Sequence, residues 1–301
     1  MGSVDPQIQA ILDRYAGASV PQSVEEARAG YDRTSLLWVG EAEEVASVAD
    51  ERVGHACVRV YRPAVSEVRG AVLWVHGGGW IMGNLTSHDA LCRALANRVG
   101  AAVVAVDYRL APETRFPGAV EDCEAALRWV ASEAFPGEPL AVAGDSAGGN
   151  LATVLARRAR DAGAPSLRAQ LLVYPATDAA CATGSHLDFG RDGTYGLSRD
   201  EMAFCWAAYA PGSALRSADV SPLRAADLSR MPPTYLLLAE LDALTDEATD
   251  YADRLEAAGT DVTVKVWPGT VHGFLRWRAC VDAAHTALDE AASWLRTQLA
   301  A

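Results

Sequence analysis

One short stretch, residues 144–149, constrains the fold of this chain more than any other. It has the sequence Gly-Asp-Ser-Ala-Gly-Gly, and it lies between two apolar runs at 140–143 and 151–156. That order is typical of a strand, a tight turn with Ser146 at its apex, and a helix. Glycines two residues before and after the serine permit the turn, because side chains there would collide. The turn would hold the Ser146 hydroxyl above a sheet, close to the first amides of the helix.

Length and composition indicate a large folded unit. The chain has 301 residues, half of them hydrophobic and 22% charged, so it can bury a substantial core as one domain or as a domain with an insertion. Its net charge is −13, from 26 Lys and Arg against 39 Asp and Glu. Such a charge repels phosphate backbones, and we therefore expect no nucleic-acid partner.

The cysteines and the apolar runs bear on the compartment. Six cysteines lie far apart and form no Cys-x-x-Cys pair, which favours reduced, mostly buried thiols and no metal site. No run approaches membrane-spanning length, and the first residues carry neither a signal peptide nor a myristoylation signal. We expect a cytoplasmic protein without a membrane span.

Apolar runs of strand length alternate with amphipathic helical segments along the chain. Strands without polar alternation that are separated by helices indicate an α/β fold, with a mostly parallel central sheet covered by helices on both sides. The predicted strands are residues 57–61, 71–75, 101–106, 140–143, 170–174, 234–239 and 262–266. The clearest predicted helices are residues 89–99, 246–258 and 282–299.

Two segments depart from this alternation. Residues 1–45 have helical spacing and no strand pattern, which is typical of a packing or lid element. Residues 176–223 are rich in Gly, Asp and Ser and contain one predicted helix around 202–206. An insertion of that length is more often a lid than a structureless loop. We expect the core to comprise residues 46–175 and 224–301.

Two residues in the last third of the chain can activate the serine. A serine hydroxyl needs a base at neutral pH, and an imidazole serves only when a partner orients it. Asp242 follows the strand 234–239, and His272 follows the strand 262–266 with a glycine beside it. The order Ser146, Asp242, His272 is the one expected on an α/β-hydrolase sheet, where strand ends share one crevice.

Spacing alone leaves other candidates for the acid and the base. His285 falls within a helix and His55 precedes an early strand, so we expect both to be structural. The competing acids are Glu240, Asp246 and Glu247, and the competing histidines are His55, His88, His186 and His285.

A glycine run directly follows the buried strand 71–75. It comprises His76 and three glycines, which let the main chain approach a substrate without obstruction. The alternative interpretation of this glycine run is a flexible loop. Its place after a strand and before the serine turn favours an oxyanion loop, where backbone amides stabilise developing negative charge. We expect His76 to organise this loop rather than to titrate in catalysis.

Together these motifs resemble one family. The chain is similar to the hormone-sensitive-lipase family of α/β-hydrolase esterases, also called bacterial esterase family IV. The matching stretches lie in family order over residues 70–275: His-Gly-Gly-Gly-Trp at 76–80, Tyr-Arg-Leu-Ala-Pro-Glu at 108–113, Gly-Asp-Ser-Ala-Gly-Gly-Asn at 144–150, Glu-Leu-Asp-Ala-Leu-Thr-Asp-Glu at 240–247 and His-Gly-Phe at 272–274.

The resemblance implies a role for each triad residue. Ser146 would be the nucleophile, His272 the general base and acid, and Asp242 the carboxylate that orients His272. The chain departs from the family at Ala243, where a proline usually follows the acid. Alanine in place of proline would loosen the turn that holds Asp242.

The resemblance also implies an oxyanion hole, a cap and a dimer. The amides of Gly78, Gly79 and Ala147 would form the oxyanion hole. Residues 1–45 and part of the 176–223 insertion would form a helical cap. Members of the family often dimerise through the last strand, here residues 262–266 from Val262 to Val266, so a homodimer through this edge is expected.

The function that follows is hydrolysis of small-molecule carboxylic esters through an acyl-enzyme, without cofactor or metal. The family favours short to medium acyl chains. A lactonase, thioesterase or amidase would use the same residues, and fold does not decide among them. A ligand-binding protein on the same fold is a further alternative. Plant gibberellin receptors resemble this family but have lost the catalytic histidine, so His272 argues against that role.

Aromatic residues of the insertion offer an apolar wall. Phe204, Trp206 and Tyr209 would roof an acyl pocket, or pack in the core as aromatic sets at helical spacing usually do.

Overall fold

A single sheet organises the chain. The computed structural model describes residues 2–15, 23–65 and 68–301. Among these residues, eight strands pair in the order β1-β2-β4-β3-β5-β6-β7-β8. Their bounds are β1 (Ser47–Val53), β2 (Ala56–Arg62), β3 (Ala71–Val75), β4 (Ala102–Asp107), β5 (Leu140–Asp145), β6 (Ala169–Val173), β7 (Thr234–Leu241) and β8 (Val262–Val271).

The sheet is mostly parallel, as expected. β1 pairs with β2, and β2 with β4, in antiparallel fashion, whereas every pairing from β4 through β3 to β8 is parallel. Trp74 lies opposite Ala105 on one side and Ala143 on the other, so the central register is continuous across three strands. The carboxyl ends of the parallel strands therefore open at one edge of the sheet.

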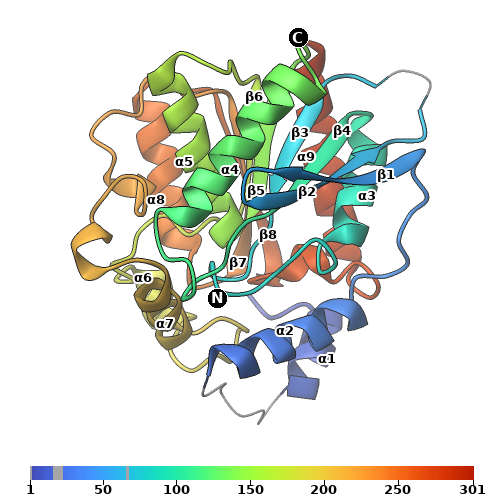
Figure 1. Cartoon of the computed structure of the whole chain (residues 1–301). Helices are drawn as coiled ribbons and strands as arrows, with labels where there is room; N and C mark the ends of the chain where they lie inside the picture. Colours follow the sequence, from blue (N-terminus) through green and yellow to red (C-terminus); the bar gives the residue numbers. More distant parts are fainter. Residues whose placement is uncertain (1, 16–22, 66–67) are drawn as a thin grey trace.

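Helices cover both faces (Figure 1). α4, α5 and α8 pack on one face, and α3 and α9 on the other. Each face has its own buried apolar cluster, because successive strand residues alternate sides: Leu73 joins the first cluster and Trp74 the second. The helices are α1 (Pro6–Tyr15), α2 (Val24–Leu37), α3 (Asp89–Val99), α4 (Gly118–Trp129), α5 (Ala147–Ala162), α6 (Gly184–Asp188), α7 (Arg199–Tyr209), α8 (Thr245–Ala257) and α9 (Asp282–Ala300).

Local chemistry explains several helix ends. α3 ends at Gly100, whose left-handed φ of 72° lets its amide bond the carbonyl of Ala96. α7 begins with a capping box, in which the side chains of Ser198 and Glu201 each accept from the other residue's backbone amide. Both ends are specified by residues adjacent to them in the sequence.

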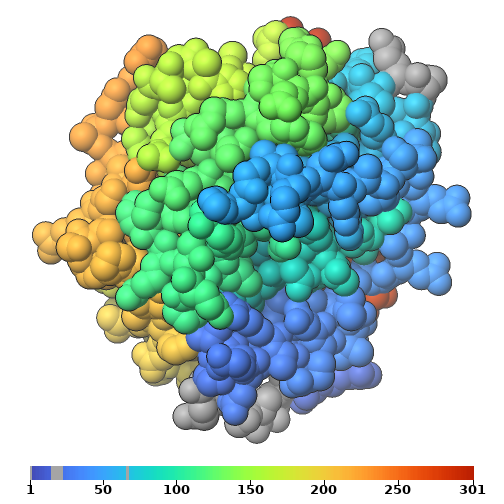
Figure 2. Space-filling model, viewed as in Figure 1, coloured from blue at the N-terminus to red at the C-terminus, as the bar shows by residue number. Residues whose placement is uncertain are grey.

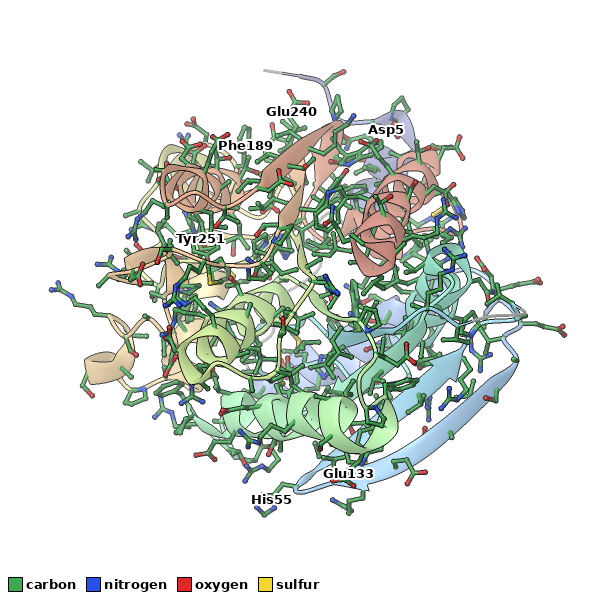
Figure 3. The ribbon with its side chains drawn as sticks, turned by 90° about the horizontal axis from the view of Figure 1, so that it is seen from above. Asp5, His55, Glu133, Phe189, Glu240 and Tyr251 are labelled. Atoms are coloured by element: carbon green, nitrogen blue, oxygen red, sulfur yellow. The ribbon has the colours of Figure 1, made fainter. Side chains whose placement is uncertain are left out.

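One strand escaped the sequence prediction. β1 was not expected, since its residues up to Arg52 are exposed and show no alternation. It forms because β2 offers it an antiparallel edge, closed by the turn at Gly54 and His55. Figure 3 shows His55 at the outer edge of the molecule, where it serves no site. β8 is also longer than expected and extends to Val271.

The N-terminal helices lie at the carboxyl edge of the sheet. Figure 1 shows α1 and α2 at the same end of the molecule as α6 and α7. Arg28 of α2 binds both carboxylate oxygens of Glu113 at 2.7 Å, and it donates to the carbonyls of Ile81 and Ala111 at 2.7 and 2.9 Å. On the face drawn in Figure 2, the N-terminal residues form a continuous surface with the segment that follows β4. Arg28 thus ties α2 to the loops after β3 and β4.

Within residues 2–15, 23–65 and 68–301, no helix combines the length and the hydrophobicity needed to cross a membrane. All six cysteines carry free thiols, four of them buried, as the sequence predicted.

Candidate active site

The serine turn has the strained geometry that its glycines predict. Ser146 sits between β5 and α5 with φ 56° and ψ −119°, which is rare for a residue with a side chain. Its amide donates to the carbonyl of Val173 at 2.8 Å. A Cβ on Gly144 or Gly148 would collide with the carbonyl of Val75. Backbone contact between β3 and the start of α5 therefore excludes any other residue at these two positions.

The structure brings Ser146, Asp242 and His272 together. Nε2 of His272 lies 2.9 Å from Oγ of Ser146, and Nδ1 lies 2.7 Å from Oδ2 of Asp242. Asp242 is 1% exposed and Ser146 8% exposed, so both are nearly dehydrated. With Asp242 ionised, Nδ1 carries the proton, and Nε2 is free to accept the proton of the Ser146 hydroxyl.

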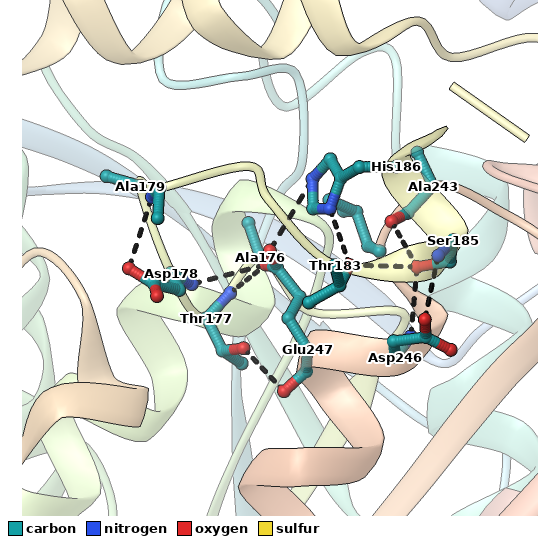
Figure 4. A network of polar contacts seen from close by, with 12 residues as sticks. Ala176, Thr177, Asp178, Ala179, Thr183, Ser185, His186, Ala243, Asp246 and Glu247 are labelled. Atoms are coloured by element: carbon teal, nitrogen blue, oxygen red, sulfur yellow. Dashed lines mark hydrogen bonds and ion pairs between the residues drawn. The ribbon is translucent and has the colours of Figure 1, made fainter. Parts of the chain in front are cut away.

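Asp242 is held although its turn lacks the usual proline. Its Oδ1 accepts from the amide of Leu244 at 3.0 Å, and its carbonyl accepts from the amide of Thr245 at 3.2 Å. The hydroxyl of Ser185, on α6, donates to the carbonyl of Ala243 at 2.7 Å (Figure 4). A hydrogen bond from the insertion thus restrains the turn at Ala243.

The competing acids have other partners. Glu240 accepts from the amide of Gly269 at 2.7 Å, and Figure 3 shows Glu240 at the same outer end as Asp5. Asp246 accepts from the amide of Ser185 at 2.7 Å. Glu247, 1% exposed, accepts from two amides of the segment after β6.

The competing histidines also lie away from Ser146. His285 contacts the carbonyl of Arg278 at 2.5 Å, and His186 contacts the hydroxyl of Thr183 at 2.7 Å. His88 lies 3.2 Å from a carboxylate oxygen of Asp145.

The glycine loop is shaped by close contacts. Gly78 and Gly79 have φ of 118° and 60°, and a Cβ on either would collide, with the carbonyl of Met82 and with Sγ of Cys205 respectively. The carbonyl of Gly78 accepts from the amide of Met82 at 2.9 Å. Across the described chain, the amides of Gly78, Gly79 and Ala147 donate no hydrogen bond, so they remain available to an oxyanion.

His76 organises this loop. Its Nδ1 donates to the carbonyl of Gly77 at 2.9 Å, and its ring stacks on Tyr108 with centroids 4.3 Å apart. The Tyr108 hydroxyl donates to the carbonyl of His76 at 3.0 Å. Burial lowers the pKa of His76 to about 3, so the ring is neutral at physiological pH.

The sequence analysis did not anticipate the role of Asp145. This carboxylate, 2% exposed, accepts from the amide of Gly77 at 2.9 Å and faces His88. Burial alone would raise the pKa of Asp145, but His88, Arg276 and the Gly77 amide outweigh it and hold the pKa at about 2. An ionised carboxylate therefore ties the serine turn to the glycine loop. The available signal was the polar residue beside Ser146 in an otherwise apolar strand.

The aromatic residues of α7 pack in the core. Trp206 and Tyr209 are buried against Trp80 of the glycine loop, with ring centroids 4.1 and 4.6 Å apart from it. Phe204 is 46% exposed. The packing alternative holds for Trp206 and Tyr209, and a role of Phe204 in roofing a pocket stays a prediction.

The chain matches known proteins over most of its length. A family model described as alpha/beta hydrolase fold matches residues 72–276. Carboxylesterase NlhH of Mycobacterium tuberculosis is 38% identical over 311 residues, which cover 98% of this chain and 96% of the relative. The ethyl acetate hydrolase of Pseudomonas putida is 37% identical over 95% of this chain and 96% of the relative.

The chain belongs to the hormone-sensitive-lipase-like family IV of α/β-hydrolase esterases. A hyperthermophilic esterase from Pyrobaculum calidifontis has the same fold, with a TM-score of 0.92 and 36% identity over 99% of this chain and all of that one. The expected family and fold are confirmed, and the chain is a hydrolytic enzyme of the carboxylesterase class.

Two buried ionisable side chains, His186 and Glu247, lie beside the turn that follows Asp242 (Figure 4). Nε2 of His186 is 3.6 Å from Oε2 of Glu247, and both side chains are almost inaccessible. Burial raises the pKa of Glu247 to about 8, against two backbone amides that lower it. Burial also lowers the pKa of His186. Both groups are thus neutral near pH 7.

The Glu247 pKa predicts how stability depends on pH. Its folded pKa of about 8 lies above the ordinary value of 4.5, so its contribution to stability is full below pH 4.5 and is lost as pH rises through 8. We expect the free energy of unfolding of Glu247→Gln to fall less between pH 5 and 7.5 than that of the unaltered protein, by on the order of 2 kcal/mol. Urea unfolding at both pH values measures this.

Glu256→Gln is the matched control, because Glu256 lies exposed on the same helix. Equal pH slopes for the unaltered protein and Glu247→Gln would show that Glu247 titrates normally.

Proposed function

We propose that this esterase hydrolyses carboxylic esters through an acyl-enzyme on Ser146. His272 takes the serine proton as Oγ attacks the ester carbonyl, and the leaving alkoxide receives that proton. Water activated by His272 then releases the acid. Asp242 fixes the His272 tautomer and stabilises its charged form.

One observation carries this proposal. His272 contacts the nucleophile and the carboxylate through its two nitrogens, at 2.9 and 2.7 Å. The amides of Gly79 and Ala147 would receive the developing oxyanion, with Gly78 beside them. Because these donors are backbone groups of a loop whose shape is fixed by close contacts, they need little reorganisation as charge develops.

The substrates we propose are esters with short to medium acyl chains. The names of two relatives support small acyl groups: the ethyl acetate hydrolase of Pseudomonas putida, and the acetyl-hydrolase of Streptomyces hygroscopicus, which is 32% identical over 91% of this chain.

The remaining parts of the proposal concern the cap, the compartment and the assembly. Residues 1–45 and part of 176–223 act as the cap, in keeping with the position of α2 against the loops after β3 and β4. The six free thiols suit the reducing cytoplasm. Two copies pair through β8, an edge strand on which Val264 and Val266 are about 40% exposed.

Removal of the nucleophile tests the mechanism. We expect Ser146→Ala to lose at least about 10³-fold in kcat/KM on p-nitrophenyl acetate, because the attacking oxygen is gone. Ser132→Ala, on the α4 side of the molecule, is the control and should keep its activity. A fluorophosphonate probe should label the unaltered protein at Ser146. Retained hydrolysis by Ser146→Ala would reject the acyl-enzyme.

Acyl preference is tested with p-nitrophenyl esters from acetate to palmitate. We expect kcat/KM to peak at eight carbons or fewer, by roughly 10-fold or more over palmitate, because longer chains exceed the space beside the glycine loop. A maximum at palmitate would contradict the proposed substrate range.

The homodimer is tested by sedimentation velocity. A charge on the edge strand should disrupt strand pairing, so we expect Val264→Lys to shift the protein from dimer to monomer. Leu36→Lys places the same charge at an exposed position of α2 and should leave the dimer intact. A monomer in the unaltered protein would exclude pairing through β8.

A further inference from the structure

A positively charged group without a carboxylate partner lies beside His272. Arg276 follows His272 by four residues, in the short helical turn Phe274–Arg276. In the described chain its guanidinium donates one hydrogen bond, from Nη1 to the Ser35 hydroxyl of α2 at 3.0 Å, and has no carboxylate within 4 Å. Most of its N–H donors therefore have no acceptor among the described residues.

A tyrosine ring contacts this guanidinium. It lies over the ring of Tyr31, on α2, at 4.5 Å from the ring centroid. Tyr174 directly follows β6, and its ring lies 4.8 Å from that of His272. On α2 the guanidinium thus meets a hydroxyl and an aromatic ring, and neither of them is an anion.

Arg276 keeps its charge in this position. Burial alone would lower its pKa, but Tyr31, Asp145 and Tyr174 raise it overall. Asp145 acts at a distance, because its own oxygens are held by the Gly77 amide at 2.9 Å and by His88 at 3.2 Å. The guanidinium therefore keeps its positive charge, and no carboxylate of the described residues lies within 4 Å to neutralise it.

The cation is close to the reacting residues. Nη2 of Arg276 lies 3.9 Å from the place that a Cβ on Gly273 would occupy, and Gly273 is bonded to His272. The side chain of Arg276 is partly exposed, so the guanidinium is not sealed off by packing. A substrate group that reaches past His272 towards α2 meets it.

We propose that Arg276 forms a subsite for a carboxylate carried by the ester substrate. The inference rests on the proposed ester hydrolysis at Ser146. A guanidinium presents paired N–H donors that match the two oxygens of a carboxylate. The carboxylate itself does not react. It positions the ester bond, and in a chain of net charge −13 it is held by local charge rather than by the overall field.

Matched ester pairs test the subsite. Monoethyl succinate and ethyl levulinate differ by a carboxylate against a methyl ketone on the acyl side. Acetoxyacetate and acetoxyacetone differ in the same way on the alcohol side. In each pair we measure kcat/KM with a pH-stat and take the ratio of the anionic to the neutral ester. General damage to the fold affects both esters of a pair, because both are measured with the same variant. Its effect on kcat/KM therefore cancels in the ratio.

The expected result is a selective loss in at least one pair. Arg276→Gln should lower the ratio by about 10- to 100-fold, mainly through KM, since a charged hydrogen-bonded partner is removed. Arg276→Lys should restore part of it. Ser35→Ala loosens the contact with α2 while the charge remains, and its ratio should stay above that of Arg276→Gln.

A purely structural Arg276 predicts a different result. Arg276→Gln would then slow both esters of each pair together, with unchanged ratios, and this outcome overturns the subsite. The proposed function fails separately, when the unaltered protein hydrolyses neither neutral ester or when Ser146→Ala hydrolyses them. Hydrolysis of the neutral esters with unchanged ratios therefore rejects only the carboxylate subsite.

Discussion

The close approach of α5 to β3 is the contact on which the active site depends. Gly148, in the first turn of α5, lies against the carbonyl of Val75, so no side chain fits there. This contact positions Ser146 in its strained backbone conformation, and β6 supports it through the bond from the Ser146 amide to Val173. Contacts with the surrounding parallel sheet stabilise the strained backbone conformation of this turn. The place where α5 starts therefore sets the positions of Ser146 and of the Ala147 amide, one of the proposed oxyanion donors.

Buried polar side chains join the loops that this contact brings together. Asp145 links the serine turn to Gly77 and His88, which lie 68 and 57 residues earlier in the chain. Glu247 links α8 to the segment after β6, and Ser185 links the insertion to Ala243. Such contacts are strong only because water is excluded. Because of these contacts, the position of Asp242 depends on the insertion at residues 176–223 as well as on β7.

Different parts of the fold were predictable to different degrees. The runs 71–75, 140–143 and 234–239 are apolar on both faces, and each is a buried central strand in the structure. β1 has no such pattern, because an exposed edge strand is specified by its neighbour rather than by its own composition. Phe204 lies on the same helix as the buried Trp206 and Tyr209 but is 46% exposed, since helical spacing does not tell which face of α7 meets the core.

The sequence by itself determined the family, the α/β architecture and the candidate residues Ser146, Asp242 and His272, because their motifs occupy strand ends in a diagnostic order. It left Glu240, Asp246 and Glu247 as rival acids. Only the tertiary structure assigned each acid a partner, since hydrogen bonding depends on distances of a few tenths of an ångström that spacing along a chain does not encode. The lack of a carboxylate partner for Arg276 among the described residues is likewise a property of the folded chain, because it is defined only by what surrounds the side chain.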